Sequence, residues 1–165
     1  MKKILLIVAI FITANLSLKA QSFSDFTLND LDDNEVTLSK LLEKGPVFIS
    51  FWASWCEPCK EEMKQTNAIF EKYKDKGFTL LAVNEDNQKS LSKVKSYIEA
   101  KGYKFTVVLD TDRKVYESYW GNADLQLPYS VLLNKNKEIV AKHAGFLPGD
   151  EIKISEEIQS ALDTK

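Results

Sequence analysis

Strand-like apolar runs alternate with amphipathic helical stretches along most of this 165-residue chain. Apolar runs of about four to eight residues are typical of buried strands, whereas apolar residues recurring every three or four positions are typical of helices. A helix between two such runs carries the chain back across a sheet, so the alternation predicts an α/β domain with a largely parallel central sheet. Its length allows one domain with a well-formed core.

The expected elements are as follows. Two short strands over residues 26–28 and 35–38 flank the polar turn 30–34, as in a hairpin. We then expect a helix over 39–44, a strand over 47–52, a helix over 59–76 ended by Gly77, a strand over 78–84, a helix over 90–101 ended by Gly102, a strand over 105–109 and a short helix over 113–120. Adjacent antiparallel strands over 129–133 and 138–143 and a last helix over 150–162 complete a mixed sheet.

The two cysteines of the chain, Cys56 and Cys59, lie three residues apart between the strand at 47–52 and the following helix. Residues i and i+3 share one face of a helix, so the two sulfurs can form a disulfide without backbone movement. The N–H groups and dipole at the start of the helix favour a thiolate on Cys56. We therefore expect Cys56 to be the nucleophile and Cys59, facing inward, to resolve the mixed disulfide. Pro58 suits an early helical position, where an N–H is not needed.

Three other interpretations of the pair are a structural disulfide, a zinc site and two unrelated buried cysteines. Closing so small a loop adds little stability. A zinc site needs four ligands, and beyond the pair the chain offers only His143 as a soft donor. The neighbouring Trp55 and Pro58 and the strand–helix context favour redox chemistry. We expect no metal and no other cofactor, and we expect His143 to be a sheet residue with a satisfied ring.

The N-terminus has the pattern of a secretory signal peptide. A positive segment, residues 1–3, precedes an apolar stretch over 4–16 that is short for a membrane span, and Ala20 is a small residue suited to cleavage. We predict a signal peptide over residues 1–20, a domain over 21–165 and a periplasmic protein. An uncleaved membrane anchor is the alternative, since Lys19 is unusual at a cleavage site.

The charge balance of the predicted mature chain is acidic. Removing residues 1–20 removes three lysines and no acid, which changes the formal net charge from −2 to −5, with 19 basic and 24 acidic side chains. An acidic chain without a basic cluster argues against nucleic acid as a partner. We expect a monomer.

The stretch FWASWCEPCK at residues 51–60 resembles the active site of the thioredoxin superfamily, specifically its exported TlpA/ResA-like branch. The hairpin at 26–38 is similar to the N-terminal extension of that branch, and residues 85–110 occupy the place of its extra helix and strand. Residues 107–112, VVLDTD, are similar to its pattern there. The likeness covers about residues 23–160. It implies a thioredoxin-like fold, a central mixed sheet flanked by helices, with an N-terminal β-hairpin and a helix–strand insert.

The resemblance also implies roles for individual residues. Leu127 and Pro128 stand where the superfamily places a cis-proline opposite the dithiol, with the backbone of Leu127 pairing with a substrate strand. An ordinary trans proline at the start of a strand is the alternative. Glu62 matches an acidic residue near the active site that tunes the cysteine pKa values and passes a proton to Cys59. Its alternative is a solvated helix glutamate beside Glu61.

Two positions depart from the family pattern. Many cytosolic thioredoxins carry a buried aspartate six residues before the first cysteine, where this chain has Ser50. A serine cannot act as a carboxylate base, so proton transfer falls to Glu62, to water or to no group. Tyr129 and Ser130 follow Pro128 where the family commonly has a threonine, and Tyr129 is expected to reshape the substrate groove.

The direction of the reaction depends on how stable the reduced form is. Glu57 places a negative charge some 6 to 8 Å from Cys56, worth roughly 0.5 to 1 kcal/mol against the thiolate. A less stable thiolate lowers the potential and favours reduction of substrates. Glu57 is equally well explained as a favourable first-turn acid. We expect Trp55, Glu57 and Pro58 to contact substrate.

The family resemblance implies a reductant of disulfides in exported proteins, often apocytochromes c before haem attachment, which draws electrons from a membrane thiol/disulfide donor. Two rival functions are a peroxidase of the peroxiredoxin kind and a module that binds thiols without turnover. The chain has no Thr-x-x-Cys active site with a supporting arginine.

Overall fold

The computed structural model of the protein describes residues 22–121 and 125–164. The predicted signal peptide over residues 1–20 lies outside these residues. The helices and strands occur in the predicted order: β1 Thr27–Asn29, β2 Glu35–Thr37, α1 Leu38–Leu42, β3 Val47–Trp52, α2 Glu57–Tyr73, the 3-10 helix η1 Lys74–Lys76, β4 Thr79–Asn84, the 3-10 helix η2 Gln88–Ser90, α3 Leu91–Lys101, β5 Thr106–Leu109, α4 Lys114–Trp120, β6 Tyr129–Leu133, β7 Ile139–Ala144 and α5 Asp150–Asp163.

The central sheet has five strands in the order β5-β4-β3-β6-β7. Strands β3, β4 and β5 are parallel to one another, whereas β6 is antiparallel to both β3 and β7. The predicted mixed sheet is therefore confirmed. The N-terminal hairpin of β1 and β2 is also confirmed, as a separate two-stranded sheet.

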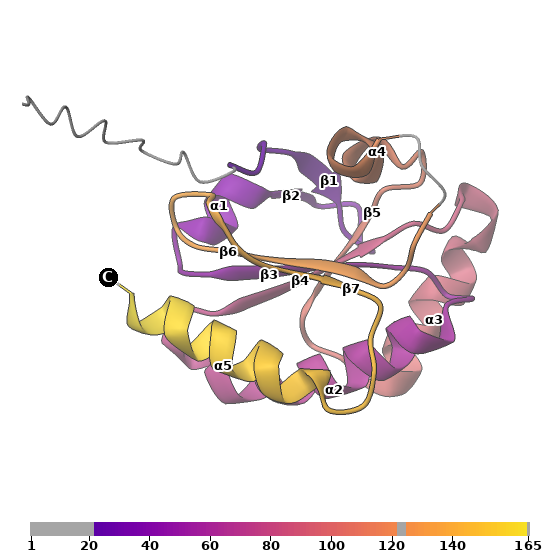
Figure 1. Ribbon diagram of the computed structural model, residues 1–165. Helices are drawn as coiled ribbons and strands as arrows, with labels where there is room; N and C mark the ends of the chain where they lie inside the picture. Colours follow the sequence, from indigo (N-terminus) through magenta and orange to yellow (C-terminus); the bar gives the residue numbers. More distant parts are fainter. Residues whose placement is uncertain (1–21, 122–124, 165) are drawn as a thin grey trace, which may run out of the picture.

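Helices cover both faces of the sheet (Figure 1). Helices α2, α3 and α5 lie on one face, and α1, α4 and the hairpin lie on the other. Alternate residues of β3 supply the two cores, since Phe48 and Trp52 belong to one cluster and Ile49 and Phe51 to the other. A central strand that is buried on both faces reads as a nearly continuous apolar run, and residues 47–52 have this pattern with Ser50 as their one polar residue.

The helix after β3 differs from its predicted bounds. It begins at Glu57 instead of residue 59, because Cys56 has extended backbone angles and caps the helix, and Pro58 needs no N–H in the first turn. Its α-helical part ends at Tyr73, and the last residues before Gly77 form the 3-10 turn η1. The other boundaries differ from prediction by one or two residues, the ordinary uncertainty of element ends.

Among residues 22–121 and 125–164, no helix combines the length and apolar character that crossing a membrane requires.

Candidate active site

The two cysteines form a disulfide at the carboxyl edge of the sheet. The sulfur atoms of Cys56 and Cys59 are 1.99 Å apart, and the two Cα atoms are 5.3 Å apart. Cys56 is the N-cap of α2, where its Sγ accepts a hydrogen bond from the Cys59 N–H at 3.2 Å. Cys56 is 5% exposed and Cys59 is fully buried, so only the Cys56 side of the disulfide has surface that a partner can reach.

The rim of the site consists of the residues around the dithiol. Trp55 is 59% exposed, and Glu57 and Pro58 are exposed as well. The Glu57 carboxylate lies 2.5 Å from the Lys60 ammonium group. The charge that was expected to disfavour the Cys56 thiolate is therefore paired with a cation one turn along α2, and a pair this exposed contributes little net field.

A groove of about 550 Å³ lies beside this rim, between the first turns of α2 and the end of α3. Its lining mixes acids, lysines and two tyrosines, and the ammonium group of Lys60 lies 5.7 Å from the centre of the Tyr97 ring. The seven lining residues are Glu57, Lys60, Glu61, Lys64, Tyr97, Lys101 and Tyr103.

The peptide bond between Leu127 and Pro128 is cis, as predicted. Strand β6 pairs with β3 in a register that sets Tyr129 opposite Phe51. Continuing that antiparallel register places Pro128 and Leu127 beside the end of β3, from which the dithiol loop leaves. Pro128 is buried, and partly buried Leu127 packs against the apolar cluster that contains both cysteines. The structure therefore brings these two residues to the dithiol loop.

Glu62 is fully buried on α2, so its alternative interpretation as a solvated helix glutamate is wrong. Both carboxyl oxygens accept hydrogen bonds: Ser50 Oγ donates to Oε2, and Ser130 Oγ donates to Oε1 at 3.1 Å. Burial is the main cause that raises the pKa of Glu62 to about 7, the two serine hydroxyls act in the lowering direction, and Asp150 raises it further. The site thus holds one carboxyl group that titrates near neutral pH.

The two serines explain how the chain departs from the thioredoxin pattern at residue 50. Ser50 and Ser130 are directly opposite each other in the β3–β6 ladder, so their side chains leave the same face of the sheet. Both hydroxyls bind the Glu62 carboxyl group on the side of α2 that packs against the sheet. The buried acid is therefore supplied by the helix, and the strand position supplies a hydroxyl that binds it.

Asp86 and Ser54 form a further buried contact that sequence reasoning missed. The Asp86 carboxyl group accepts hydrogen bonds from the Ser54 backbone N–H at 2.6 Å and from the Ser54 hydroxyl at 2.8 Å. Ser54 lies two residues before Cys56 in the loop that follows β3. The available signal was positional: Asp86 follows a buried strand, and the carboxyl ends of parallel strands meet at one edge of a sheet.

Two more acids at this edge were also missed. Glu85 directly follows β4 and Asp110 directly follows β5, and the register that pairs Asn84 with Leu109 sets them on adjacent strand ends. Glu85 and Asp110 are 5% and 1% exposed. Both Glu85 carboxyl oxygens and Asp110 Oδ1 have no hydrogen-bond partner within the described part of the chain. Burial first, and then the charge of Asp110, raises the pKa of Glu85 to about 9.

His143 lies on β7 with its Nε2 atom 2.7 Å from a carboxylate oxygen of Glu157. This contact confirms the prediction of a satisfied sheet histidine. Trp52 is fully buried in the core, whereas Trp55 lies at the surface of the site. Within residues 22–121 and 125–164, no group of three or more His, Cys, Asp and Glu side chains could hold a metal ion.

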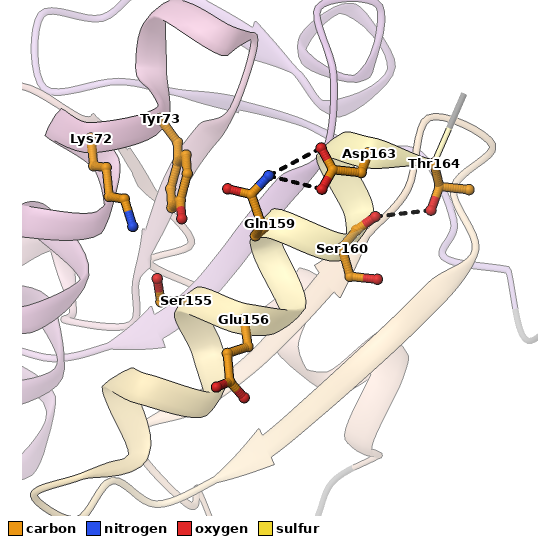
Figure 2. A pocket seen from close by; sticks show the side chains of 8 residues that line it. All are labelled: Lys72, Tyr73, Ser155, Glu156, Gln159, Ser160, Asp163 and Thr164. Carbon is orange, nitrogen blue, oxygen red and sulfur yellow. Dashed lines mark hydrogen bonds between the residues drawn. The ribbon is translucent and has the colours of Figure 1, made fainter.

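A groove of about 710 Å³ lies between the end of α2 and α5, away from the dithiol. Figure 2 shows Lys72 and Tyr73 of α2 on one side of it and the α5 side chains on the other. Gln159 donates to both carboxylate oxygens of Asp163, at 3.0 and 2.9 Å. Because Tyr73 ends a helix that is about 25 Å long, this groove is remote from Cys56, which caps the other end.

The mixed sheet, the dithiol at the start of α2 and the cis-proline beside it define a thioredoxin-like protein with a redox disulfide. Residues 20–142 match the AhpC/TSA family, and the chain belongs to that family and, within it, to the ResA-like thiol-disulfide oxidoreductases.

The relatives support this assignment at moderate identity. The chain is 34% identical over 121 residues to thiol-disulfide oxidoreductase ResA of Bacillus thuringiensis, covering 73% of this chain and 66% of the relative. It is 37% identical over 129 residues to the ResA of Geobacillus kaustophilus, covering 78% and 71% of the two chains. The chain thus spans about two thirds of the length of these curated relatives.

A solved thiol:disulfide interchange protein from a Bacteroides species has the same fold. It superposes with a TM-score of 0.69 at 29% identity, over 88% of this chain and 91% of that chain. The thioredoxin-like fold predicted from the sequence is confirmed by this likeness together with the observed sheet order.

Proposed function

We propose that this protein reduces disulfides of exported proteins outside the cytoplasm, through a mixed disulfide at Cys56 that Cys59 resolves. The observation that carries the proposal is the disulfide itself, with Cys56, 5% exposed, at the N-terminus of α2 and Cys59 fully buried one turn along the helix. The similarity to thiol-disulfide oxidoreductases supports the same chemistry.

The reaction transfers two electrons from the dithiol to the substrate. The Cys56 thiolate attacks one sulfur of the substrate disulfide, which breaks that bond, forms a mixed disulfide and releases one substrate thiolate. Cys59 then loses its proton and attacks Cys56 Sγ, which releases the second substrate thiolate and leaves the Cys56–Cys59 disulfide. The N–H of Cys59, which points at Cys56 Sγ, stabilises the attacking thiolate in the first step.

Glu62 is proposed to accept the Cys59 proton. The two residues are three positions apart on α2 and therefore share a face. A carboxyl group whose pKa is about 7 is divided between its two protonation states near neutral pH, which suits a proton carrier. Ser50 and Ser130 orient it, because each hydroxyl donates to a different carboxyl oxygen.

Substrate is proposed to bind over the surface formed by Trp55, Glu57, Pro58, Leu127 and Pro128. Exposed Trp55 offers apolar contact area next to Cys56. An extended segment of the substrate would pair with the backbone of Leu127, as an added strand beside the end of β3.

The test of this mechanism is trapping through Cys59→Ser, since an enzyme without its resolving thiol accumulates mixed disulfides at Cys56. We expect covalent adducts that a reductant releases, and we expect none from the matched control Cys56→Ser. If Cys59→Ser traps no partner, the module that binds thiols without turnover is the better account.

A peroxidase of the same fold is separated by comparing peroxide consumption with insulin reduction. We expect insulin reduction to be the faster reaction. The chain contains a single arginine, Arg113, which follows β5 and precedes α4 instead of lying in the dithiol motif. Fast turnover of hydrogen peroxide would contradict the reductase proposal.

The proposed compartment rests on the predicted signal peptide. We propose that cleavage after Ala20 releases a monomeric domain over 21–165 into the periplasm, where a membrane thiol/disulfide donor re-reduces Cys56 and Cys59. Apocytochrome c is one proposed substrate. Mass spectrometry of the protein from the periplasmic fraction tests the cleavage: a chain that begins at Gln21 supports it, and an intact N-terminus in the membrane fraction supports the anchor.

A further inference from the structure

The loop that presents Cys56 is anchored by Asp86, in the segment that follows the neighbouring strand β4. Asp86 is 2% exposed, and its carboxyl group accepts three hydrogen bonds. Oδ2 accepts from the Ser54 backbone N–H at 2.6 Å and from the Asn84 side-chain amide at 2.9 Å, and Oδ1 accepts from the Ser54 hydroxyl at 2.8 Å. All three contacts use Asp86 as an acceptor, as suits a carboxylate.

The anchored residue lies directly before the reactive part of the motif. Ser54 is 2% exposed and is followed by Trp55 and Cys56. The Cys56 N–H bonds to the Ala53 carbonyl at 3.0 Å, so residues 53–56 form a tight turn whose middle is held by Asp86. A second link joins the same two strands, because the Glu85 N–H bonds to the Trp52 carbonyl at 2.9 Å. The turn is thus fixed to the segment that follows β4, on both sides of Ala53.

This arrangement matters for the sulfur, because the orientation of the Cys56 side chain depends on the turn. Cys56 Sγ receives the Cys59 N–H only while Cys56 keeps its extended N-cap conformation. A thiolate is stabilised by such N–H groups and by the helix dipole over a short range, within the first turn. A loosened turn therefore costs thiolate stability.

We propose that Asp86 is a positioning residue of the dithiol: it holds Ser54 so that the Cys56 sulfur faces the N-terminus of α2. The inference rests on the proposed thiol–disulfide chemistry of Cys56. Asp86 acts through the turn, because its carboxyl group binds Ser54 and Asn84.

The positioning role of Asp86 and its negative charge predict opposite changes in the pKa of the Cys56 thiol. As a bare negative charge near Cys56, Asp86 disfavours the thiolate, so its removal would lower the pKa of the Cys56 thiol. As a positioning group it favours the thiolate, so its removal raises that pKa. The direction of the change therefore separates the two roles.

The experiment measures the pKa of the Cys56 thiol in the reduced, full mature chain by thiolate absorbance, in Asp86→Asn, Asp86→Ala and Ser54→Ala. Asn and Ala remove the same charge, but Asn retains one oxygen that can accept from Ser54. We expect the thiolate fraction at a fixed pH below the pKa to fall roughly tenfold in Asp86→Ala and less in Asp86→Asn. In Ser54→Ala, which keeps the charge of Asp86, we expect the thiolate fraction to fall as well.

Asp32→Asn is the matched control, because Asp32 is an exposed acid in the turn between β1 and β2, where it pairs with Lys95. A thiolate fraction that rises, or that stays equal to wild type in all three variants, overturns the proposal. If Asp86→Ala does not fold, the thiolate fractions of Asp86→Asn and Ser54→Ala test the proposal by themselves. Insulin reduction by the wild type is assayed in parallel, so failure of the proposed function is seen separately from failure of this inference.

Discussion

Ser50 on β3 donates a hydrogen bond to the carboxyl group of Glu62 on α2, and this contact lies wholly inside the protein. Its strand partner Ser130 donates to the other oxygen of the same carboxyl group. Two hydroxyls are too few to offset the cost of burial, so the pKa of Glu62 stays raised to about 7. Glu62 thus places a carboxyl group with a pKa of about 7 on the same face of α2 as Cys59.

Glu62→Gln should slow resolution of the mixed disulfide. The ionised carboxylate is the form that accepts a proton, so the wild-type rate is expected to rise as pH passes through about 7. The variant is expected to lose this step in the pH profile and to be slower by about tenfold or more at pH 7.5. Stopped-flow measurement of a preformed mixed disulfide checks it. Glu61→Gln, a part-exposed neighbour, is the control, and an unchanged profile in Glu62→Gln would remove Glu62 from the mechanism.

Glu62 should also make folding stability depend on pH. Its pKa is about 7 in the folded protein against 4.5 for the unperturbed group, so the folded state binds more protons between these values. The contribution of Glu62 to the unfolding free energy therefore falls as pH rises from 4.5 to 7, by about 3 kcal/mol, and levels off above the folded pKa. Chemical denaturation of Glu62→Gln against wild type should show a flatter dependence over this window. Equal slopes for the two proteins would contradict the raised pKa.

Glu57 and Lys60 should have opposite effects on the pKa of the Cys56 thiol that cancel while the two charges are paired. Because the two charges are 2.5 Å apart, Glu57→Gln alone leaves Lys60 unpaired and is expected to lower the Cys56 thiol pKa. Lys60→Gln leaves Glu57 unpaired and is expected to raise it, by about half a pH unit. The double variant should return close to wild type. If the Cys56 thiol pKa of the double variant stays clearly away from the wild-type value, the two charges do not cancel at Cys56 and the prediction is wrong.

Trp55 should contribute to substrate binding without changing the redox chemistry. It is 59% exposed next to a buried disulfide, so Trp55→Ala removes contact area and no core packing. We expect the KM for insulin to rise several-fold while the equilibrium potential stays unchanged. Leu147→Ala, another exposed apolar residue, is the control. A shift in potential with an unchanged KM would assign Trp55 to the dithiol itself.

The sequence predicted the sheet and helices well because the signals are local. Residues 47–52 are apolar except for Ser50, a pattern that predicts a central buried strand. Gly77 and Gly102 end their helices in the left-handed conformation. The dithiol and the cis bond at Pro128 also follow from short motifs.

The contacts around the site depend on register, which no local pattern gives. Ser130 reaches Glu62 only because β6 sets it opposite Ser50. Asp86 follows β4 and meets Ser54, which follows the adjacent strand β3 and is 32 residues away in the chain. The burial of Glu62 was likewise hidden, since Glu61 and Glu62 are identical in kind and only packing of α2 on the sheet distinguishes them.

The equilibrium reduction potential of Cys56 and Cys59 against glutathione tests the central claim most directly, because it decides the direction in which electrons flow. The account predicts a value in the range of reducing thioredoxins, below about −230 mV. A value close to that of strong oxidants, about −120 mV, would contradict it and assign the protein to disulfide formation.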